Sequence, residues 1–318
     1  MSNIYIYSPS GATRDKAAFK RGVQRLKKAG YSVVLDDAAL LSEQRFAGDD
    51  AMRLAAIGRA SVAQADMTLI ARGGYGLSRI LPQIDYEAIS ASIARGTQWM
   101  GFSDFTALQL ALLAKQGVGP NSITWAGLSL GDDVACIPRE GAEPDDITMA
   151  CFDDVLQGIA EGAGWRMSAA QAQSCGEVAI EDAPLWGGNL AMVCSLLGTP
   201  YFPNYQSQRG VKNGILFLED TGEAPYKIER MLTQLLHAGV LQSQRAIVLG
   251  AFSHYKLAPH DKGFNLKSVV AWLREHVAVP IVEGLPFGHV ETKVCLPVGA
   301  RVSLQVQERD AFILWESV

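Results

Sequence analysis

The feature that most constrains the fold is the alternation of short apolar runs with helical patterns through the first half of the chain. Residues 4–7, 31–35, 67–71 and 98–102 are apolar runs of strand length, and the segments between them carry apolar residues at helical spacing. Strands that alternate with helices pair in parallel, because each crossover helix returns the chain to the same end of the sheet. We therefore expect a layered parallel sheet with flanking helices and with its functional residues at the carboxyl ends of the strands.

The second half of the chain mixes strands and helices and closes on two alternating strand patterns, at 300–307 and 311–315. The sequence thus predicts an α/β fold in three parts. An N-terminal α/β domain covers residues 1–139, a connecting helix and linker covers 140–175, and a smaller C-terminal α/β domain rich in mixed strands covers 176–318.

Composition excludes several classes of protein. Of 318 residues, 48% are apolar and 19% are charged, which is typical of a globular chain. The net charge of -5 argues against a nucleic acid or an anionic membrane as partner. No apolar stretch has the length of a signal peptide core or a membrane span, so we expect a cytosolic protein. The scattered cysteines favour reduced thiols over a disulfide framework or zinc site: Cys136, Cys151, Cys175, Cys194 and Cys295.

A serine stands between a predicted strand and a predicted helix in the motif Gly101-Phe102-Ser103-Asp104. Such a serine lies on a sharp turn that exposes its hydroxyl group, and the backbone N–H of Asp104 at the helix N-terminus can face a developing oxyanion. Serine is also a preferred helix N-cap, and the motif lacks the second glycine of Gly-x-Ser-x-Gly. The motif by itself leaves Ser103 either as a nucleophile or as a helix cap.

A glycine-rich turn, Arg72-Gly73-Gly74-Tyr75-Gly76, follows the predicted strand 67–71. The turn is a poor phosphate loop, because it has neither a Gly-Lys-Ser/Thr sequence nor dinucleotide-binding spacing. It is either an ordinary tight turn or a segment whose backbone approaches a ligand. In the second case Gly74 would supply an oxyanion donor and Tyr75 would form a wall of the substrate site.

A nucleophilic serine needs a base and a carboxylate. His289 follows a predicted strand and a segment in which glycine and proline fix the backbone, and Glu219 ends an apolar strand. Each residue also has an ordinary explanation, as an exposed loop histidine and as a solvated acid. The chain order Ser103, Glu219, His289 on strand ends is the order found in α/β-hydrolases. The other histidines end helices or lie in a polar loop without a motif: His237, His254, His260 and His276.

A final motif, Gly187-Gly188-Asn189, opens a probable helix. Asn189 is a candidate either for a helix cap or for a substrate contact. The preceding Trp186 is a candidate either for the core or for the wall of a substrate pocket.

These pieces, taken in order, resemble the LD-carboxypeptidase family, also called muramoyltetrapeptide carboxypeptidases. The resemblance implies that Ser103 is the nucleophile, that Glu219 and His289 complete a triad, and that the backbone amides of Asp104 and Gly74 bind the oxyanion. The motifs that carry it span most of the chain: Ser8-Pro9-Ser10-Gly11, Arg72 to Gly76, Gly-Phe-Ser-Asp at 101–104, Gly-Gly-Asn-Leu at 187–190, Leu-Glu-Asp at 218–220 and Gly-Leu-Pro-Phe-Gly-His at 284–289.

The resemblance implies a metal-independent serine carboxypeptidase without a cofactor. Its substrate would be a cytosolic murein tetrapeptide, cut between the L-centre of a diamino acid and the terminal D-alanine during peptidoglycan recycling. The family likeness also suggests a homodimer. Because murein peptides are anionic, Arg72 is a candidate carboxylate partner, with a solvated arginine as the alternative.

One stretch departs from the family pattern. Where many members carry His-Gly-Pro after the nucleophile helix, this chain has Ala126-Gly127-Leu128. The departure does not involve Ser103, Glu219 or His289, but it leaves more than one class of substrate to consider. The alternatives are a related amidase that inactivates a peptide-nucleotide antibiotic, and a non-catalytic module that binds a sugar or nucleotide.

Overall fold

The first of two β-sheets is built almost entirely from the N-terminal half of the chain. The computed structural model describes residues 2–135 and 143–316; Cys136 and the first part of the predicted linker lie outside them. The strand order is β11-β5-β4-β3-β1-β2, and every pair is parallel except β11 with β5. The strands are β1 (Asn3–Tyr7), β2 (Ser32–Leu35), β3 (Met67–Ile70), β4 (Gln98–Gly101), β5 (Thr124–Ala126) and β11 (Leu296–Val298).

Most helices of this half begin where the sequence provides a side-chain cap, and α4 is the exception. The carboxylates of Asp15, Asp49 and Asp85 accept hydrogen bonds from the first-turn amides of three helices, which satisfies donors that would otherwise lack partners. The helices are α1 (Lys16–Lys28), α2 (Asp50–Val62), α3 (Tyr86–Ala94) and α4 (Thr106–Gln116).

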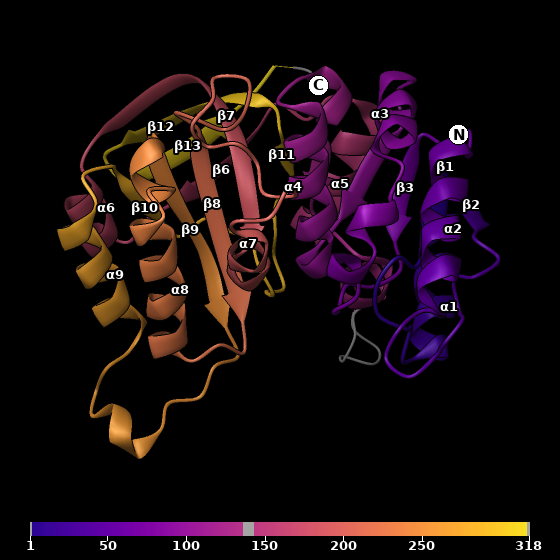
Figure 1. Ribbon diagram of the computed structural model, residues 1–318, viewed down its shortest axis with the longest axis horizontal. Coiled ribbons are helices and arrows are strands. Elements are labelled where there is room, and N and C mark those ends of the chain that lie inside the picture. The colour runs from indigo at the N-terminus through magenta and orange to yellow at the C-terminus, as the bar shows by residue number, and fades with distance from the viewer. Residues whose placement is uncertain (1, 136–142, 317–318) are drawn as a thin grey trace.

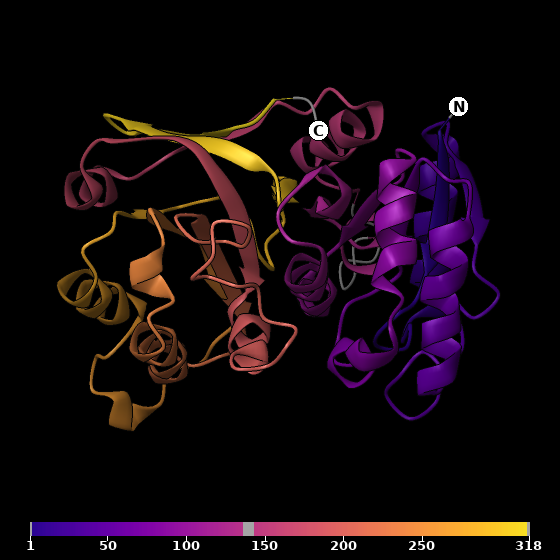
Figure 2. The ribbon, with the colours of Figure 1, turned by 45° about the horizontal axis from the view of Figure 1, so that its top comes forward.

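The second sheet has seven strands in the order β10-β9-β8-β7-β12-β13-β6. Its first four strands are parallel and the rest are antiparallel, so the sheet is mixed. In Figures 1 and 2 it stands beside the N-terminal part, with helices α8 and α9 along one side. The strands are β6 (Gly162–Arg166), β7 (Val178–Asn189), β8 (Ile215–Thr221), β9 (Ala246–Ser253), β10 (Ile281–Glu283), β12 (Arg301–Gln307) and β13 (Asp310–Leu314). The helices are α5 (Asp146–Gln157), α6 (Ala169–Cys175), α7 (Leu190–Leu196), α8 (Pro225–His237) and α9 (Leu266–His276).

Short helical turns complete the described chain. Ser103 begins one of them, η3, and η5 is a π-helical turn that follows β5. The turns are η1 (Leu77–Arg79), η2 (Leu81–Gln83), η3 (Ser103–Phe105), η4 (Pro120–Ser122), η5 (Leu130–Val134), η6 (Leu241–Ser243) and η7 (Pro259–Asp261).

The predicted fold class, an N-terminal parallel sheet followed by a mixed C-terminal sheet, is confirmed. The two sheets do not follow the predicted domain ranges, however. The range 140–175, expected to be a connection, contributes β6 to the edge of the second sheet. β11 comes from the C-terminal range and pairs with β5 in the first sheet. The chain therefore crosses between the sheets again after β10 and ties the two halves together.

Candidate active site

Ser103 lies at the carboxyl end of β4, at the start of η3, and its backbone is strained. Its φ is +61°, a value that residues with a side chain rarely adopt. The turn is tight enough to need glycine two residues earlier, since a Cβ on Gly101 would lie 2.2 Å from Cγ of Phe105. A strained serine on a strand-to-helix turn has the geometry of a nucleophile elbow.

The glycine turn after β3 packs directly against this serine. A Cβ on Gly73 would lie 3.0 Å from Cβ and 3.4 Å from Oγ of Ser103. The next residue, Gly74, has a φ of +82° that favours glycine. Within the described residues, neither the N–H of Gly74 nor that of Asp104 has a hydrogen-bond acceptor in the protein. Two unpartnered amides thus belong to the segments that meet at the serine.

The Asp104 carboxylate ties the loops around Ser103 together. Its Oδ2 accepts hydrogen bonds from the hydroxyl of Ser10 at 2.7 Å and from the amide of Leu77 at 2.9 Å. Asp104 is buried, and burial raises its pKa to about 6 although both bonds oppose the shift. The Ser8–Gly11 motif and the glycine turn are therefore both anchored to the residue after Ser103.

His289 and Glu219 meet as the sequence order suggests. Nδ1 of His289 lies 2.9 Å from Oε2 of Glu219, whose side chain is fully buried at the end of β8. The imidazole ring lies 4.5 Å, centroid to centroid, from the ring of Phe102, the neighbour of Ser103. Among the described residues no hydrogen bond joins Ser103 Oγ to His289. The structure thus shows the acid–base pair formed and brings it to the residue adjacent to the serine.

Asn189 supports Glu219 from the other side. Its Nδ2 donates to Oε1 of Glu219 at 3.1 Å, while its Oδ1 caps α7 by accepting from the amide of Met192. Its backbone N–H donates to Oγ1 of Thr106, at the start of the helix that follows Ser103. Of the two roles that the sequence allowed, the structure shows the cap and adds a bond to the buried carboxylate that the sequence did not signal.

Trp186 belongs to the core and not to a pocket wall. Its side chain is fully buried, its indole N–H donates to Oε1 of Gln244 at 2.8 Å, and its ring packs edge-on against Phe202. The predicted contact of Trp186 with substrate is therefore wrong. The indole faces inward because residues 183–189 of β7, a central strand, are all buried.

Arg72 and Tyr75 flank the glycine turn on its outer side. Nη1 of Arg72 donates to the carbonyl of Ala12 at 3.3 Å, and a Cβ on Gly74 would lie 3.0 Å from the same nitrogen. Burial, together with the neighbouring Arg14, lowers the pKa of the Arg72 guanidinium. Tyr75 is exposed and lies beneath the guanidinium of Arg45. Both side chains are thus placed beside the turn that contacts Ser103.

A buried ion pair behind Phe102 was not signalled by the sequence. Nζ of Lys293 lies 2.6 Å from Oδ1 of Asp133 and 3.9 Å from the centroid of the Phe102 ring. Lys293 lies in a loop without a recognisable motif, and nothing in its sequence context indicates burial. The pair joins the loop after β10 to η5 and so crosses between the two halves next to the site.

The departure from the family pattern lies close behind the serine. Ala126 is buried in β5 and pairs with Gly101, two residues before Ser103. A Cβ on Gly127 would lie 2.9 Å from Sγ of Cys295. The stretch fills the core beneath the site.

The remaining candidates show nothing that competes with this site. His237 and His276 end α8 and α9 as expected, and His254 bonds to Thr221 and Ser253. Within residues 2–135 and 143–316, no group of three or more His, Cys, Asp and Glu residues is placed to hold a metal ion. No helix in the same ranges is long and apolar enough to cross a membrane.

Comparison with known proteins finds relatives that match most of the chain. Residues 4–122 match the LD-carboxypeptidase N-terminal domain and residues 182–304 match the LD-carboxypeptidase C-terminal domain. A putative carboxypeptidase of Streptomyces coelicolor is 31% identical over 95% of this chain and 90% of its own. The crystal structure of muramoyltetrapeptide carboxypeptidase from Oxalobacter formigenes has a TM-score of 0.83 and 32% identity, with 99% of each chain covered. The microcin C7 self-immunity protein MccF of Escherichia coli is 26% identical over 94% of this chain and 88% of its own.

Proposed function

The chain belongs to the LD-carboxypeptidase family, and we propose that it is a serine carboxypeptidase that removes the terminal D-alanine from murein tetrapeptides. The observation that carries the proposal is the Glu219–His289 pair, whose imidazole packs against Phe102, the neighbour of a serine with a strained backbone. The bond cut would be the amide between the L-centre of the diamino acid and the D-alanine. The muramoyltetrapeptide carboxypeptidase of Oxalobacter formigenes, at 32% identity, supports this choice of substrate.

In the proposed cycle, Nε2 of His289 takes the proton of the Ser103 hydroxyl as its oxygen attacks the scissile carbonyl carbon. The fully buried Glu219 accepts from Nδ1 and stabilises the imidazolium that forms. His289 then gives the proton to the departing amine of D-alanine, and the acyl group stays on Ser103. Water, deprotonated by the same imidazole, hydrolyses that ester and restores the serine.

The oxyanion is proposed to bind to the backbone amides of Asp104 and Gly74. Neither amide has an acceptor within the described residues; Asp104 follows Ser103 in the chain, and Gly74 follows Gly73, which packs against Ser103. Preorganised amides stabilise the tetrahedral intermediate more than the planar substrate, and one such donor contributes about 3 to 4 kcal/mol. Arg72, beside Gly74, is proposed to bind a carboxylate of the anionic murein peptide, and Tyr75 to line the same part of the site.

The test is release of D-alanine from a murein tetrapeptide. The wild-type protein should release it in the presence of a chelator, because no step of this mechanism uses a metal. Ser103→Ala should abolish release and still bind the peptide, as measured by calorimetry. If wild-type protein released no D-alanine from several tetrapeptides, the carboxypeptidase proposal would be refuted. We further propose that the enzyme acts as a homodimer in cytosolic peptidoglycan recycling, which light scattering and fractionation would test.

A second candidate function is cleavage of an amide in a peptide-nucleotide. It is favoured by the 26% identity to a microcin C7 self-immunity protein and by the absence of the common His-Gly-Pro sequence around Ala126. The buried Trp186 does not support it, since that ring cannot stack on a base. Offering both substrates to the same preparation separates the two functions, because the better substrate has the higher kcat/KM.

A further inference from the structure

Four loops lie side by side along the carboxyl edge of the first sheet. Because the strands run in the order β4-β3-β1-β2, the loops after them carry, in turn, Ser103, the glycine turn, residues 8–14 and residues 36–48. Neighbouring loops are bonded: the amide of Gly11 donates to Gly73 and that of Ala12 donates to Arg45. Strands lie about 4.8 Å apart, so residues 36–48, three strands away, stand about 14 Å from Ser103, and residues 8–14 lie between them and are bonded to Asp104 through Ser10.

A pocket of about 430 Å³ lies between those last two loops. Three of its lining residues are cations, Arg14, Lys16 and Arg45, and none is a carboxylate. Within the described residues these cations form no ion pair, and the buried hydroxyl of Thr13, which also lines the pocket, has no hydrogen-bond partner. Unpaired positive charge is thus collected in one place on a protein whose net charge is -5.

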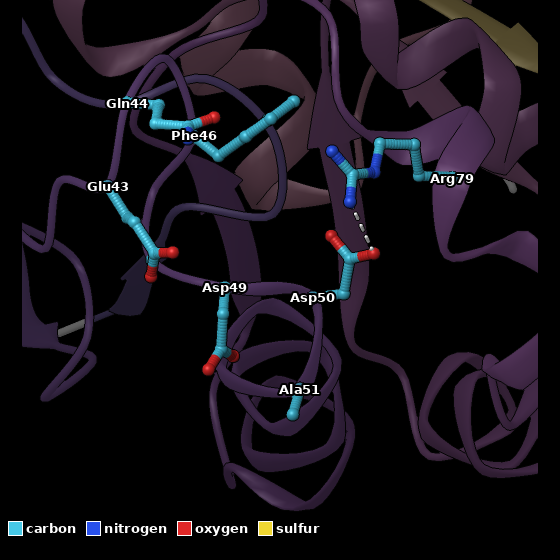
Figure 3. A pocket seen from close by; sticks show the side chains of 8 residues that line it. Glu43, Gln44, Phe46, Asp49, Asp50, Ala51 and Arg79 are labelled. Carbon is cyan, nitrogen blue, oxygen red and sulfur yellow. Dashed lines mark hydrogen bonds and ion pairs between the residues drawn. The ribbon is translucent and has the colours of Figure 1, made fainter.

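The adjoining pocket shows the contrast (Figure 3). It shares Gln44 with the first pocket, but its lining includes Glu43, Asp49 and Asp50. There the one cation, Arg79, is paired with Asp50 at 3.0 Å. In the pocket of Figure 3 the arginine thus has carboxylates within reach. The lining of the first pocket offers no carboxylate to Arg14 and Arg45.

The cationic pocket continues toward the nucleophile through Arg72. Arg72 bonds to Ala12, a residue of the pocket lining, and its guanidinium lies over the turn that contacts Ser103. Burial lowers the pKa of Arg72 most, and the charges of Arg14 and Arg45 lower it further against the opposing effect of Asp132, so both arginines lie close enough to repel the Arg72 guanidinium. A bound anion would relieve that repulsion, and arginine is suited to carboxylates because its fork of donors matches their two oxygens.

We propose that Arg14 and Arg45 form a subsite for a carboxylate in the part of the peptide that stays on the enzyme, upstream of the scissile bond. The inference rests on the proposed carboxypeptidase function. A leaving group of one residue is too short to reach residues 36–48, whereas an extended peptide spans about 3.5 Å per residue. A carboxylate about one to two residues upstream of the diamino acid therefore comes within reach of the long Arg14 and Arg45 side chains. The subsite would make the enzyme selective for acidic peptides beyond the terminal carboxylate.

The experiment compares two tetrapeptides that differ in one group. One carries a free glutamyl carboxylate upstream of the diamino acid, and in the other that carboxylate is a carboxamide. Wild type, Arg14→Gln, Arg45→Gln and the double variant are assayed on both. Arg230→Gln serves as the matched control, because Arg230 is an exposed arginine of α8 in the other half of the chain. Thermal melts confirm that each variant is folded.

For the double variant we expect KM for the free-acid peptide to rise about 10-fold with little change in kcat, the size of one lost charge-assisted hydrogen bond. The carboxamide peptide should have a raised KM with wild type and show no further rise with the variants. Arg14→Lys with Arg45→Lys should recover part of the loss. Equal effects on both peptides, or none on either, would overturn the subsite. If wild type turned over neither peptide, the proposed function would fail instead. Calorimetry of both peptides with Ser103→Ala would then still decide the subsite.

Discussion

Asn189 provides the sharpest test of how the acid–base pair is held. Its side chain caps α7 and donates to Oε1 of Glu219 at 3.1 Å, so Asn189→Ala removes both interactions. An N-cap contributes about 1 kcal/mol and a hydrogen bond to a charged group about 1.5 to 3 kcal/mol. We expect the free energy of unfolding to fall by about 2.5 to 4 kcal/mol at neutral pH.

The same substitution should lower kcat and leave KM nearly unchanged. If the hydrogen bond to Glu219 stabilises the transition state by the same 1.5 to 3 kcal/mol, its loss lowers kcat about 10- to 150-fold. The matched control is Asn265→Ala, because Asn265 caps α9 in the same way and does not contact the triad. That control should lose about 1 kcal/mol of stability and keep its kcat.

Asn189→Asp separates the cap from the support of Glu219. An aspartate still caps the helix, but it places a second carboxylate beside a fully buried one. Two charges about 4 Å apart repel by about 4 kcal/mol at an effective dielectric constant of 20, so this variant should be less stable than wild type although its helix is capped. Its kcat should also fall, because the amide donor to Oε1 of Glu219 is lost. The assays are D-alanine release between pH 5 and 9 and urea denaturation. A raised KM with kcat within twofold of wild type in Asn189→Ala would refute this reasoning and favour a substrate contact.

Three further outcomes follow from the geometry. Gly73→Ala should reduce kcat at least 10-fold, because its Cβ would lie 3.0 Å from that of Ser103; a variant with normal kcat would show that the turn moves freely. The pKa of Asp104 is raised from 3.8 to about 6, so wild type loses about 3 kcal/mol of stability as the pH rises between these values. Asp104→Asn has no carboxyl group to ionise at this position, so its free energy of unfolding should not fall in this way. Urea denaturation at pH 4 and at pH 7 should therefore show that, relative to wild type, the variant is more stable at pH 7 than at pH 4 by about 3 kcal/mol. Trp186→Phe should cost about 1 to 3 kcal/mol in chemical denaturation, through core volume and the bond to Gln244, with KM unchanged. A changed KM would return Trp186 to the substrate site.

Much of the fold and of the candidate triad could be predicted from local patterns. The alternation of strand and helix lengths predicted a parallel sheet, since crossover helices leave few other solutions. The positions of Ser103, Glu219 and His289 at strand ends followed from the same periodicity, and parallel strands bring their carboxyl ends to one edge. The glycine turn could also be recognised from the sequence, because glycines allow a backbone to approach another group closely. In the structure Gly73 makes such an approach to Ser103.

What only the tertiary structure decided concerns contacts between segments distant in the chain. β11 looks like any short apolar segment, and its partner β5 was selected by packing against the other half of the molecule. The burial of Lys293, the inward orientation of Trp186 and the second bond of Asn189 are of the same kind. Local sequence determines which conformations a segment favours, whereas the partner of a polar group is determined by the three-dimensional position of another segment. The sequence by itself therefore determined the layered fold and the chemistry available at the strand ends, and the tertiary structure decided which groups hold that chemistry in place.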